Sequence, residues 1–260
     1  MSDFSTARRR FILAITPLSL TSALAIGMLP TAHGAPVVRT EDEWFAQIAN
    51  LRGLQSAFRY SLRVESSKNG VLEVNVADVF YRSHRKVLVM FREPQAVAGR
   101  RILIDGDDMW LGMPTSQRIL RILPSQRLLG EASNGDIVNT NLYLYRMVEQ
   151  QEDTYNDTPV LRLRLEAKQP MPFYQRIDYL FDRAGELPKA SRHYAASGKL
   201  LKTIEYVDFS GNGKSKKLRA LRILNAISPE QFTLMTFSNY VTINLPDGLF
   251  VRDNLLVIEP

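Results

Sequence analysis

The sequence contains no cysteine in its 260 residues. This absence excludes disulfide bonds, thiol catalysis, cysteine-ligated zinc, iron–sulfur clusters and a lipid attached to an N-terminal cysteine. With only three histidines, the chain also has little material for a metal site. The composition therefore predicts a protein without metals or other cofactors, stabilised by a hydrophobic core.

The chain also lacks a strong excess of charge. Its formal net charge is +6, and the basic residues are spread along the sequence. This charge permits peripheral contact with anionic membrane lipid or with acidic proteins, but it does not indicate nucleic-acid binding. Hydrophobic residues make up 45% and charged residues 23%, which is typical of a folded domain.

Residues 1–34 have the organisation of an export signal. Three arginines from Arg8 onward form a charged region, residues 11–29 are mainly apolar, and small residues precede a cleavage site after Gly34. Cleavage there leaves residues 35–260, which we expect in the periplasm. An uncleaved membrane anchor is the alternative, although a proline and hydroxyl residues interrupt the apolar stretch. The arginines suit either the general secretory route or the twin-arginine route.

One helix is predicted at the start of the mature chain. Thr40 and Glu43 are spaced as a capping box, in which each side chain binds the backbone N–H of the other residue. Large apolar residues then recur at helical spacing: Trp44, Phe45, Ile48, Leu51 and Leu54. The pattern predicts an amphipathic helix over residues 41–54.

After this helix the apolar period changes to two, which is typical of strands. The clearest example is residues 161–166, where leucines alternate with charged residues. Turn residues separate about eleven such segments, the last of them at residues 233–237, 240–245 and 255–258. A second helix is expected over about residues 140–150.

Strands that follow one another in this way predict one mainly β domain over residues 35–260. We expect a curved antiparallel sheet, or half-barrel, with an N-terminal helix and helical or loop lids. Alternating strands also occur in outer-membrane proteins, but there each strand stays apolar on one face over about ten residues. Frequent prolines limit many strands here to about five or six residues, which favours a soluble curved sheet.

No catalytic motif is present: the sequence contains neither a G-x-S-x-G nucleophile motif nor an H-E-x-x-H zinc motif. His84 and His193 remain after signal removal, and a catalytic triad can in principle use either, but both are interpreted as surface or edge histidines. Asp105, Asp107 and Asp108 surround a glycine, as in a calcium loop or an ordinary hairpin turn. No glutamate follows at calcium-loop spacing, so we expect no catalytic and no metal-binding residues.

The most distinctive segment is a predicted hairpin followed by a long loop. Its characteristic residues are Asp108, Trp110, Leu111, Pro114, Arg118, Arg121 and Ile122, followed by Ser125-Gln126-Arg127 and Gly135-Asp136. In this order they resemble the outer-membrane lipoprotein-sorting protein family, which has the LolA/LolB-like fold. The acidic pair that often follows the Gly-Asp turn in that family is absent from residues 137–142.

The resemblance implies a periplasmic carrier or chaperone that binds lipid acyl chains or lipoproteins and works with an inner-membrane transporter. It assigns a binding rim or lid to Asp108, Trp110, Leu111, Pro114, Arg118, Arg121, Gln126 and Arg127. Arginine side chains there suit a lipid phosphate or an acidic partner surface. From the residues alone, the tryptophan can equally belong to the core and the arginines can be solvated.

Two neighbouring strands also supply a candidate apolar cavity. Its residues are Leu161, Leu163, Leu165, Ile177, Tyr179 and Phe181. A carrier gains about 0.8 kcal/mol for each acyl CH₂ group that it buries, but the same stripe can be ordinary core. The alternative function is an envelope sensor or interaction module that transfers no cargo. A third hypothesis, an enzyme acting on envelope material, lacks an assembled acid–base set.

Overall fold

The structure is a computed structural model that describes residues 37–53, 56–68, 70–123, 125, 127–133, 136, 142–170, 174–228 and 230–257. The chain divides into two units, residues 1–35 and 36–260, and only the second contains described residues. The predicted export signal of residues 1–34 therefore lies outside them. In the described part of the chain, no helix has the length and apolar character needed to span a membrane.

The predicted first helix is present as α1 (Glu41–Leu51), and its capping box is confirmed. The Thr40 N–H donates to Oε2 of Glu43 at 2.8 Å, and the Glu43 N–H donates to Oγ1 of Thr40 at 3.3 Å. The helix buries four large apolar side chains on one face: Trp44, Phe45, Ile48 and Leu51. It ends three residues before the predicted boundary, at a turn through Arg52 and Gly53.

Strands make up most of the rest of the described chain. They are β1 (Phe58–Lys68), β2 (Val71–Ser83), β3 (Lys86–Glu93), β4 (Arg101–Asp105), β5 (Asp108–Met113), β6 (Arg118–Ile122), β7 (Arg127–Leu129), β8 (Ala132–Ser133), β9 (Tyr145–Tyr155), β10 (Thr158–Ala167), β11 (Arg176–Asp182), β12 (Pro188–Tyr194), β13 (Leu200–Ser210), β14 (Lys217–Asn225) and β15 (Phe232–Thr242). Short 3₁₀ turns connect some of them: η1 (Pro114–Ser116), η2 (Leu142–Leu144), η3 (Gly213–Ser215), η4 (Asp247–Phe250) and η5 (Arg252–Asn254).

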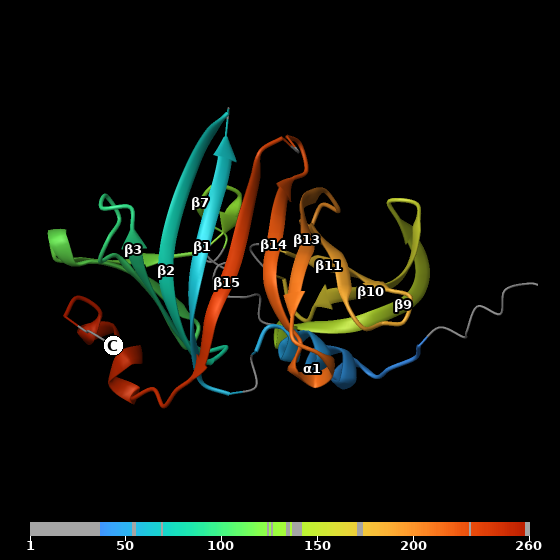
Figure 1. The fold of residues 1–260 in the computed structure, drawn as a ribbon, viewed down its shortest axis with the longest axis horizontal. Coiled ribbons are helices and arrows are strands. Elements are labelled where there is room, and N and C mark those ends of the chain that lie inside the picture. The colour runs from blue at the N-terminus through green and yellow to red at the C-terminus, as the bar shows by residue number, and fades with distance from the viewer. Residues whose placement is uncertain are drawn as a thin grey trace, which may run out of the picture. The chain divides into compact units, whose positions relative to one another are not determined.

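Thirteen of the described strands form one antiparallel sheet in the order β6-β5-β4-β3-β2-β1-β15-β14-β13-β12-β11-β10-β9. Each strand pairs with its neighbour along the chain, except that β1 pairs with β15 and joins the two halves. The sheet is not closed, since β6 and β9 form its two edges. This curved open sheet, seen in Figure 1, confirms the predicted mainly β half-barrel with an N-terminal helix.

Two apolar clusters cover the inner face of the sheet, which we define as the face that contacts α1 and the β7–β8 hairpin. The first cluster lies mainly on β1–β5, β14 and β15, and it also contains Leu129 and Ala132 of the hairpin. The second cluster joins strands β9–β11 to the buried face of α1. Among the described residues, α1 and the β7–β8 hairpin therefore cover the inner face.

The C-terminal segment covers the opposite, outer face of β2–β5 (Figure 1). Leu249, Phe250 and Leu255 pack there in a third apolar cluster. Gly112 of β5 permits this contact, because a Cβ atom at that position would lie 2.7 Å from Cγ of Leu255. Nη1 of Arg101 donates to the Leu255 carbonyl at 2.7 Å and fastens the same segment.

The predicted second helix, residues 140–150, is wrong. Residues 142–144 form the 3₁₀ turn η2, and from Tyr145 the chain is strand β9, which pairs along its length with β10. The glutamates and glutamines of this segment favour a helix locally, but cross-strand pairing overrides that propensity. Tyr145 and Met147 alternate toward the inner face, as strand residues do.

The strand predicted at residues 255–258 is also wrong for its described residues, which form a turn after η5. Two predicted strands, 233–237 and 240–245, are one strand, β15. A register shift opposite β1 and the positive φ of 55° at Asn239 mark a bulge that interrupts the alternation. The described strands outnumber the predicted eleven because β9 replaces the expected helix and because β7, β8 and β12 were not anticipated.

Candidate functional site

The β7–β8 cover, which we define as residues 127–133 together with Asp136, lies on the inner face but does not join the main sheet. Its two strands pair only with each other in a separate two-stranded sheet. Leu129 and Ala132 are buried against the first apolar cluster. Gly130 has a positive φ of 55°, and a Cβ atom there would lie 2.5 Å from Cβ of Ser66. The hairpin thus approaches the sheet as closely as glycine permits.

Hydrogen bonds with side chains fasten the middle of this cover to the sheet. The Glu131 N–H donates to Oγ1 of Thr233 at 2.8 Å, and Nδ2 of Asn225 donates to Oε2 of Glu131 at 2.8 Å. The hydroxyls of Thr233 and Ser66 lie 3.2 Å apart beneath it. The cover is therefore held by polar contacts that water or a ligand could replace.

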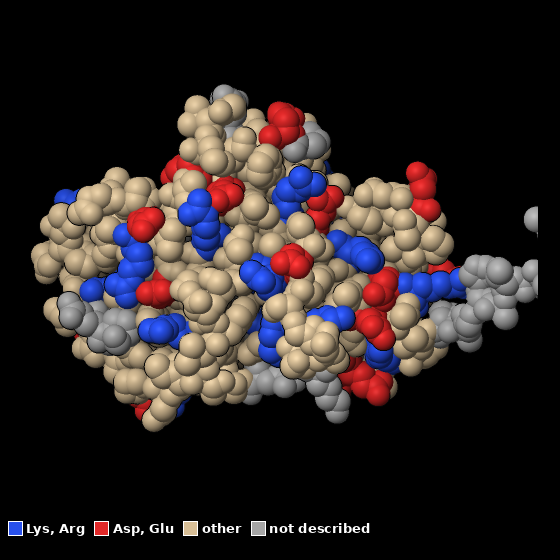
Figure 2. Space-filling view, viewed as in Figure 1, with Lys and Arg blue, Asp and Glu red and all other residues tan. Residues whose placement is uncertain are grey.

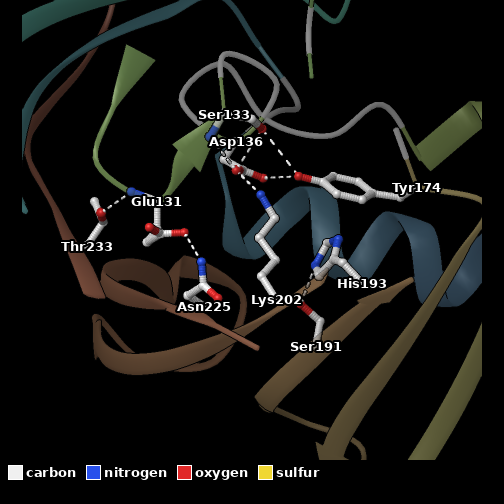
Figure 3. A network of polar contacts seen from close by, with 9 residues as sticks. All are labelled: Glu131, Ser133, Asp136, Tyr174, Ser191, His193, Lys202, Asn225 and Thr233. Atoms are coloured by element: carbon white, nitrogen blue, oxygen red, sulfur yellow. Dashed lines mark hydrogen bonds and ion pairs between the residues drawn. The ribbon is translucent and has the colours of Figure 1, made fainter. Parts of the chain in front are cut away.

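Asp136 fastens the other end of the cover through a buried ion pair with Lys202 of β13 (Figure 3). The two residues are only 5% and 6% exposed. The N–H and the hydroxyl of Ser133 each donate to Oδ2 of Asp136 at 2.8 Å, and the Tyr174 hydroxyl donates to Oδ1 at 3.4 Å. Burial raises the pKa of the Asp136 carboxyl. The charge and hydrogen bond of Lys202, together with His193 and the Ser133 hydrogen bond, outweigh burial and hold this pKa below its ordinary value.

His193 of β12 lies beside this ion pair, so the interpretation of His193 as a surface or edge histidine is wrong. It is 1% exposed, and its Nε2 lies 2.9 Å from the Ser191 hydroxyl, which lies 3.1 Å from the Tyr206 hydroxyl. The Tyr174 ring contacts it edge-on at 4.7 Å between centroids. Burial, together with the positive charge of Lys202, lowers the pKa of His193 to about 3. His84, in contrast, is exposed in the β2–β3 turn, as expected.

The predicted apolar cavity residues are all buried on β10 and β11. They pack with Trp44, Phe45 and Ile48 of α1 in the second cluster. A small cavity of about 20 Å³ lies beneath the helix, and Tyr179 is the predicted residue that lines it. This volume is near the size needed for one water molecule, so an acyl chain cannot enter there without displacement of a cover.

The structure places the predicted rim residues at the β5–β6 edge but on both faces of the sheet. Trp110 and Arg121 lie on the outer face, where Arg252 stacks over the indole at 4.8 Å and Arg121 pairs with Asp108. Leu111 packs into the inner cluster. Pro114 begins η1, and Arg118 is exposed at the start of β6. The side chain of Arg127 and all of Gln126 lie outside the described residues.

Among the described residues there is no group of three His, Asp or Glu side chains able to hold a metal ion. The aspartates considered for calcium instead pair with cations: Asp105 with Lys86, Asp107 with Arg85, and Asp108 with Arg121. On the molecular face of Figure 2, positive and negative side chains are interspersed. Several described charges form ion pairs, among them Arg63 with Glu65, Arg92 with Asp78 and Arg222 with Glu205.

A family model described as an uncharacterized protein matches residues 83–256, more than half of the chain. The chain belongs to this family. No curated protein matches it by sequence. A solved structure of a LolA superfamily protein from Nitrosomonas europaea is 23% identical, with a TM-score of 0.74, and the match covers 83% of this chain and 99% of that one.

Two further solved structures have the same fold. A domain described as an outer-membrane lipoprotein-sorting protein from Vibrio parahaemolyticus has a TM-score of 0.71 at 17% identity, covering 84% of this chain and 98% of that one. A DUF1329 family protein from Desulfovibrio piger has a TM-score of 0.69 at 16% identity, covering 84% of this chain and 100% of that one. The fold is therefore LolA-like, as the motif resemblance implied.

Sequence reasoning noted Asp136 as part of a motif but missed its partners Lys202, Tyr174 and Ser133. The sequence did contain one indication that Lys202 is buried and has a partner. It occupies the inward register of β13, two residues before Ile204, where an apolar side chain is expected. A lysine at such a position requires a buried partner, although the sequence does not say which carboxylate supplies it.

Proposed function

We propose that this protein is a non-enzymatic carrier that binds the acyl chains of a lipid or lipoprotein on the inner face of its sheet. The observation that carries the proposal is the β7–β8 cover: a hairpin outside the main sheet that buries an apolar face through replaceable side-chain contacts. The LolA-like fold of the chain supports the same function.

Displacement of the β7–β8 cover would expose the first apolar cluster without breaking a hydrogen bond of the main sheet's ladders. An acyl chain that takes its place gains about 0.8 kcal/mol per buried CH₂ group, which repays the lost contacts of Leu129 and Ala132. The LolA-like sheet thus supplies the binding surface, and the cover keeps that surface from water when no cargo is bound.

The proposed setting is the periplasm, reached by cleavage after Gly34 through either export route. An inner-membrane transporter would load the carrier, and cargo would pass on toward the outer membrane. The first test is native mass spectrometry of the mature chain purified from periplasm, with solvent extraction of bound material. A copurifying acylated species of defined mass is expected.

The role of the cover can be tested with a reversible lock. Because the chain has no cysteine, the double variant Ser66→Cys/Gly130→Cys would contain a single disulfide, which requires Cβ atoms about 3.8 Å apart and hence a shift of about 1 Å. We expect the oxidised protein to take up the neutral apolar dye N-phenylnaphthylamine far more weakly than the same protein reduced.

The reduced protein is the matched control, since it has the same sequence. Equal dye uptake by the oxidised and reduced forms would show that cargo does not enter under the cover, and would contradict the proposal. Retention of lipid without transfer to acceptor vesicles would instead support the envelope sensor, which transfers no cargo.

A further inference from the structure

A polar island interrupts the apolar inner face between its two clusters. It consists of Asp136 and Lys202 with the neighbouring side chains of Ser133, Tyr174, Ser191 and His193 (Figure 3). All of these residues are buried. A group of polar side chains in an apolar binding face is the usual means by which a pocket selects the polar part of a ligand.

The two charges of the island come from different parts of the fold. Lys202 belongs to β13 of the main sheet, whereas Asp136 belongs to the β7–β8 cover. Movement of the cover therefore separates the carboxylate from the ammonium. When cargo covers the inner face in place of the hairpin, the Lys202 ammonium is buried again away from Asp136. A buried charge is costly unless an opposite charge lies beside it, so the loaded form favours an anion in the place of Asp136.

His193 adds a buried polar side chain beside the ion pair. Its Nε2 contacts the Ser191 hydroxyl, and its Nδ1 is buried with no hydrogen-bond partner among the described residues. A neutral imidazole carries one proton, so a Ser191 hydroxyl that donates to Nε2 leaves Nδ1 as the N–H donor. The ammonium of Lys202 lies 4.7 Å from the centre of the Tyr174 ring, whose hydroxyl contacts Asp136. The Asp136 carboxylate itself is contacted by Lys202, Tyr174 and Ser133.

We infer that Lys202 is the headgroup site of an anionic phospholipid, whose phosphate takes the place of the Asp136 carboxylate when the cover moves. The acyl chains then lie on the apolar clusters on both sides of the island. The inference rests on the proposed carrier function, because it requires the cover to leave the inner face. It adds the cargo class: lipids with a net negative headgroup.

The test compares lipid uptake from two vesicle preparations with identical acyl chains, one of phosphatidylglycerol and one of phosphatidylcholine. The mature protein is separated from the vesicles, and the bound lipid is extracted and quantified by mass spectrometry. We expect a preference of at least about tenfold for phosphatidylglycerol, which corresponds to about 1.4 kcal/mol. Asp136→Asn, which removes the competing carboxylate, should increase phosphatidylglycerol uptake.

The variant Asp136→Asn/Lys202→Met removes both charges and keeps the fold free of an unpaired buried ion. We expect it to take up the two lipids equally. Lys189→Met, which removes an exposed positive charge on β12, is the matched control and should keep the preference. A preference that persists in the double variant would overturn the assignment of Lys202.

The remaining outcomes separate this inference from the proposed function. Equal uptake of both lipids by the wild-type protein would overturn the headgroup site and leave the carrier function standing. Uptake of neither lipid would also overturn the headgroup site, whereas a copurifying acylated species would still support the carrier function. Binding of inorganic phosphate alone as tightly as phosphatidylglycerol, measured by titration calorimetry, would show a phosphate site and overturn the lipid assignment.

Discussion

The inner face has two covers, and they are held in different ways. Helix α1 inserts three large apolar side chains, those of Trp44, Phe45 and Ile48, into the second cluster. The Trp44 indole N–H also donates to Gln150 of the edge strand at 2.9 Å. Among the described side chains of the β7–β8 cover, Leu129 and Ala132 contribute to the first apolar cluster. Hydrogen bonds and the Asp136–Lys202 ion pair supply the other contacts between this cover and the sheet. The helix is thus part of the core, whereas the hairpin is joined to the sheet by contacts that a polar ligand can replace.

The largest effect should come from α1. Trp44 is fully buried, lies 4.8 Å from the Phe181 ring and is covered by Arg39 at 4.6 Å. Trp44→Ala should lower the free energy of unfolding by about 4 kcal/mol, because the truncated site leaves a large cavity. Urea denaturation measures this, with Trp110→Ala as the control at a half-buried tryptophan. If Trp44→Ala lowered the unfolding free energy by less than about 1 kcal/mol, α1 would not be more firmly part of the core than the hairpin.

The next effect concerns the β7–β8 cover. Lys202→Met leaves the Asp136 carboxylate buried without its cation, which should cost about 3 kcal/mol in unfolding free energy. The double variant Asp136→Asn/Lys202→Met should recover most of this loss, because neither charge is then buried. A double-mutant cycle, with unfolding free energies measured by urea denaturation, gives the coupling energy between Asp136 and Lys202. Additive losses in the two single variants would show that the pair does not fasten the cover.

The sequence predicted α1 well because its signals are local: the capping box and the apolar face both lie within about four turns of helix. Most strands were predicted by their alternation, but β7, β8 and β12 were not anticipated. At β9, pairing with β10 overrides helical propensity. The Asp136–Lys202 pair joins residues 66 positions apart, and β1 meets β15 across most of the chain. Such non-local contacts leave no periodic signal, so the buried site beneath the cover was only partly foreseen.

A smaller, pH-dependent effect should come from His193 beside the cover. Its pKa of about 3 in the folded protein lies below the ordinary value of about 6.5, so the unfolded chain binds the proton first. This contribution to stability is complete above pH 6.5 and is lost progressively as the pH falls toward 3, by about 1.4 kcal/mol per pH unit.

We therefore expect His193→Gln to reduce the acid sensitivity by about 2 kcal/mol between pH 7 and pH 5, measured as unfolding free energy in urea. The Asp136 carboxylate stays ionised over this range, because the positive charge of Lys202 helps to hold its pKa below the ordinary value. His84→Gln, at the exposed histidine, is the control. If the unfolding free energy of His193→Gln depended on pH in the same way as that of the wild type, His193 would not be a buried neutral imidazole.

The smallest effect returns to α1, at its first turn. Thr40→Ala removes the side-chain acceptor for the Glu43 N–H and should cost about 1 kcal/mol in unfolding free energy, whereas Thr40→Ser should cost little. Because this change loosens only the helix, lipid uptake should stay at the wild-type level. If Thr40→Ala instead increased lipid uptake as much as Asp136→Asn, α1 would move together with the hairpin. The inner face would then have one joint cover in place of a fixed helix and an exchangeable hairpin.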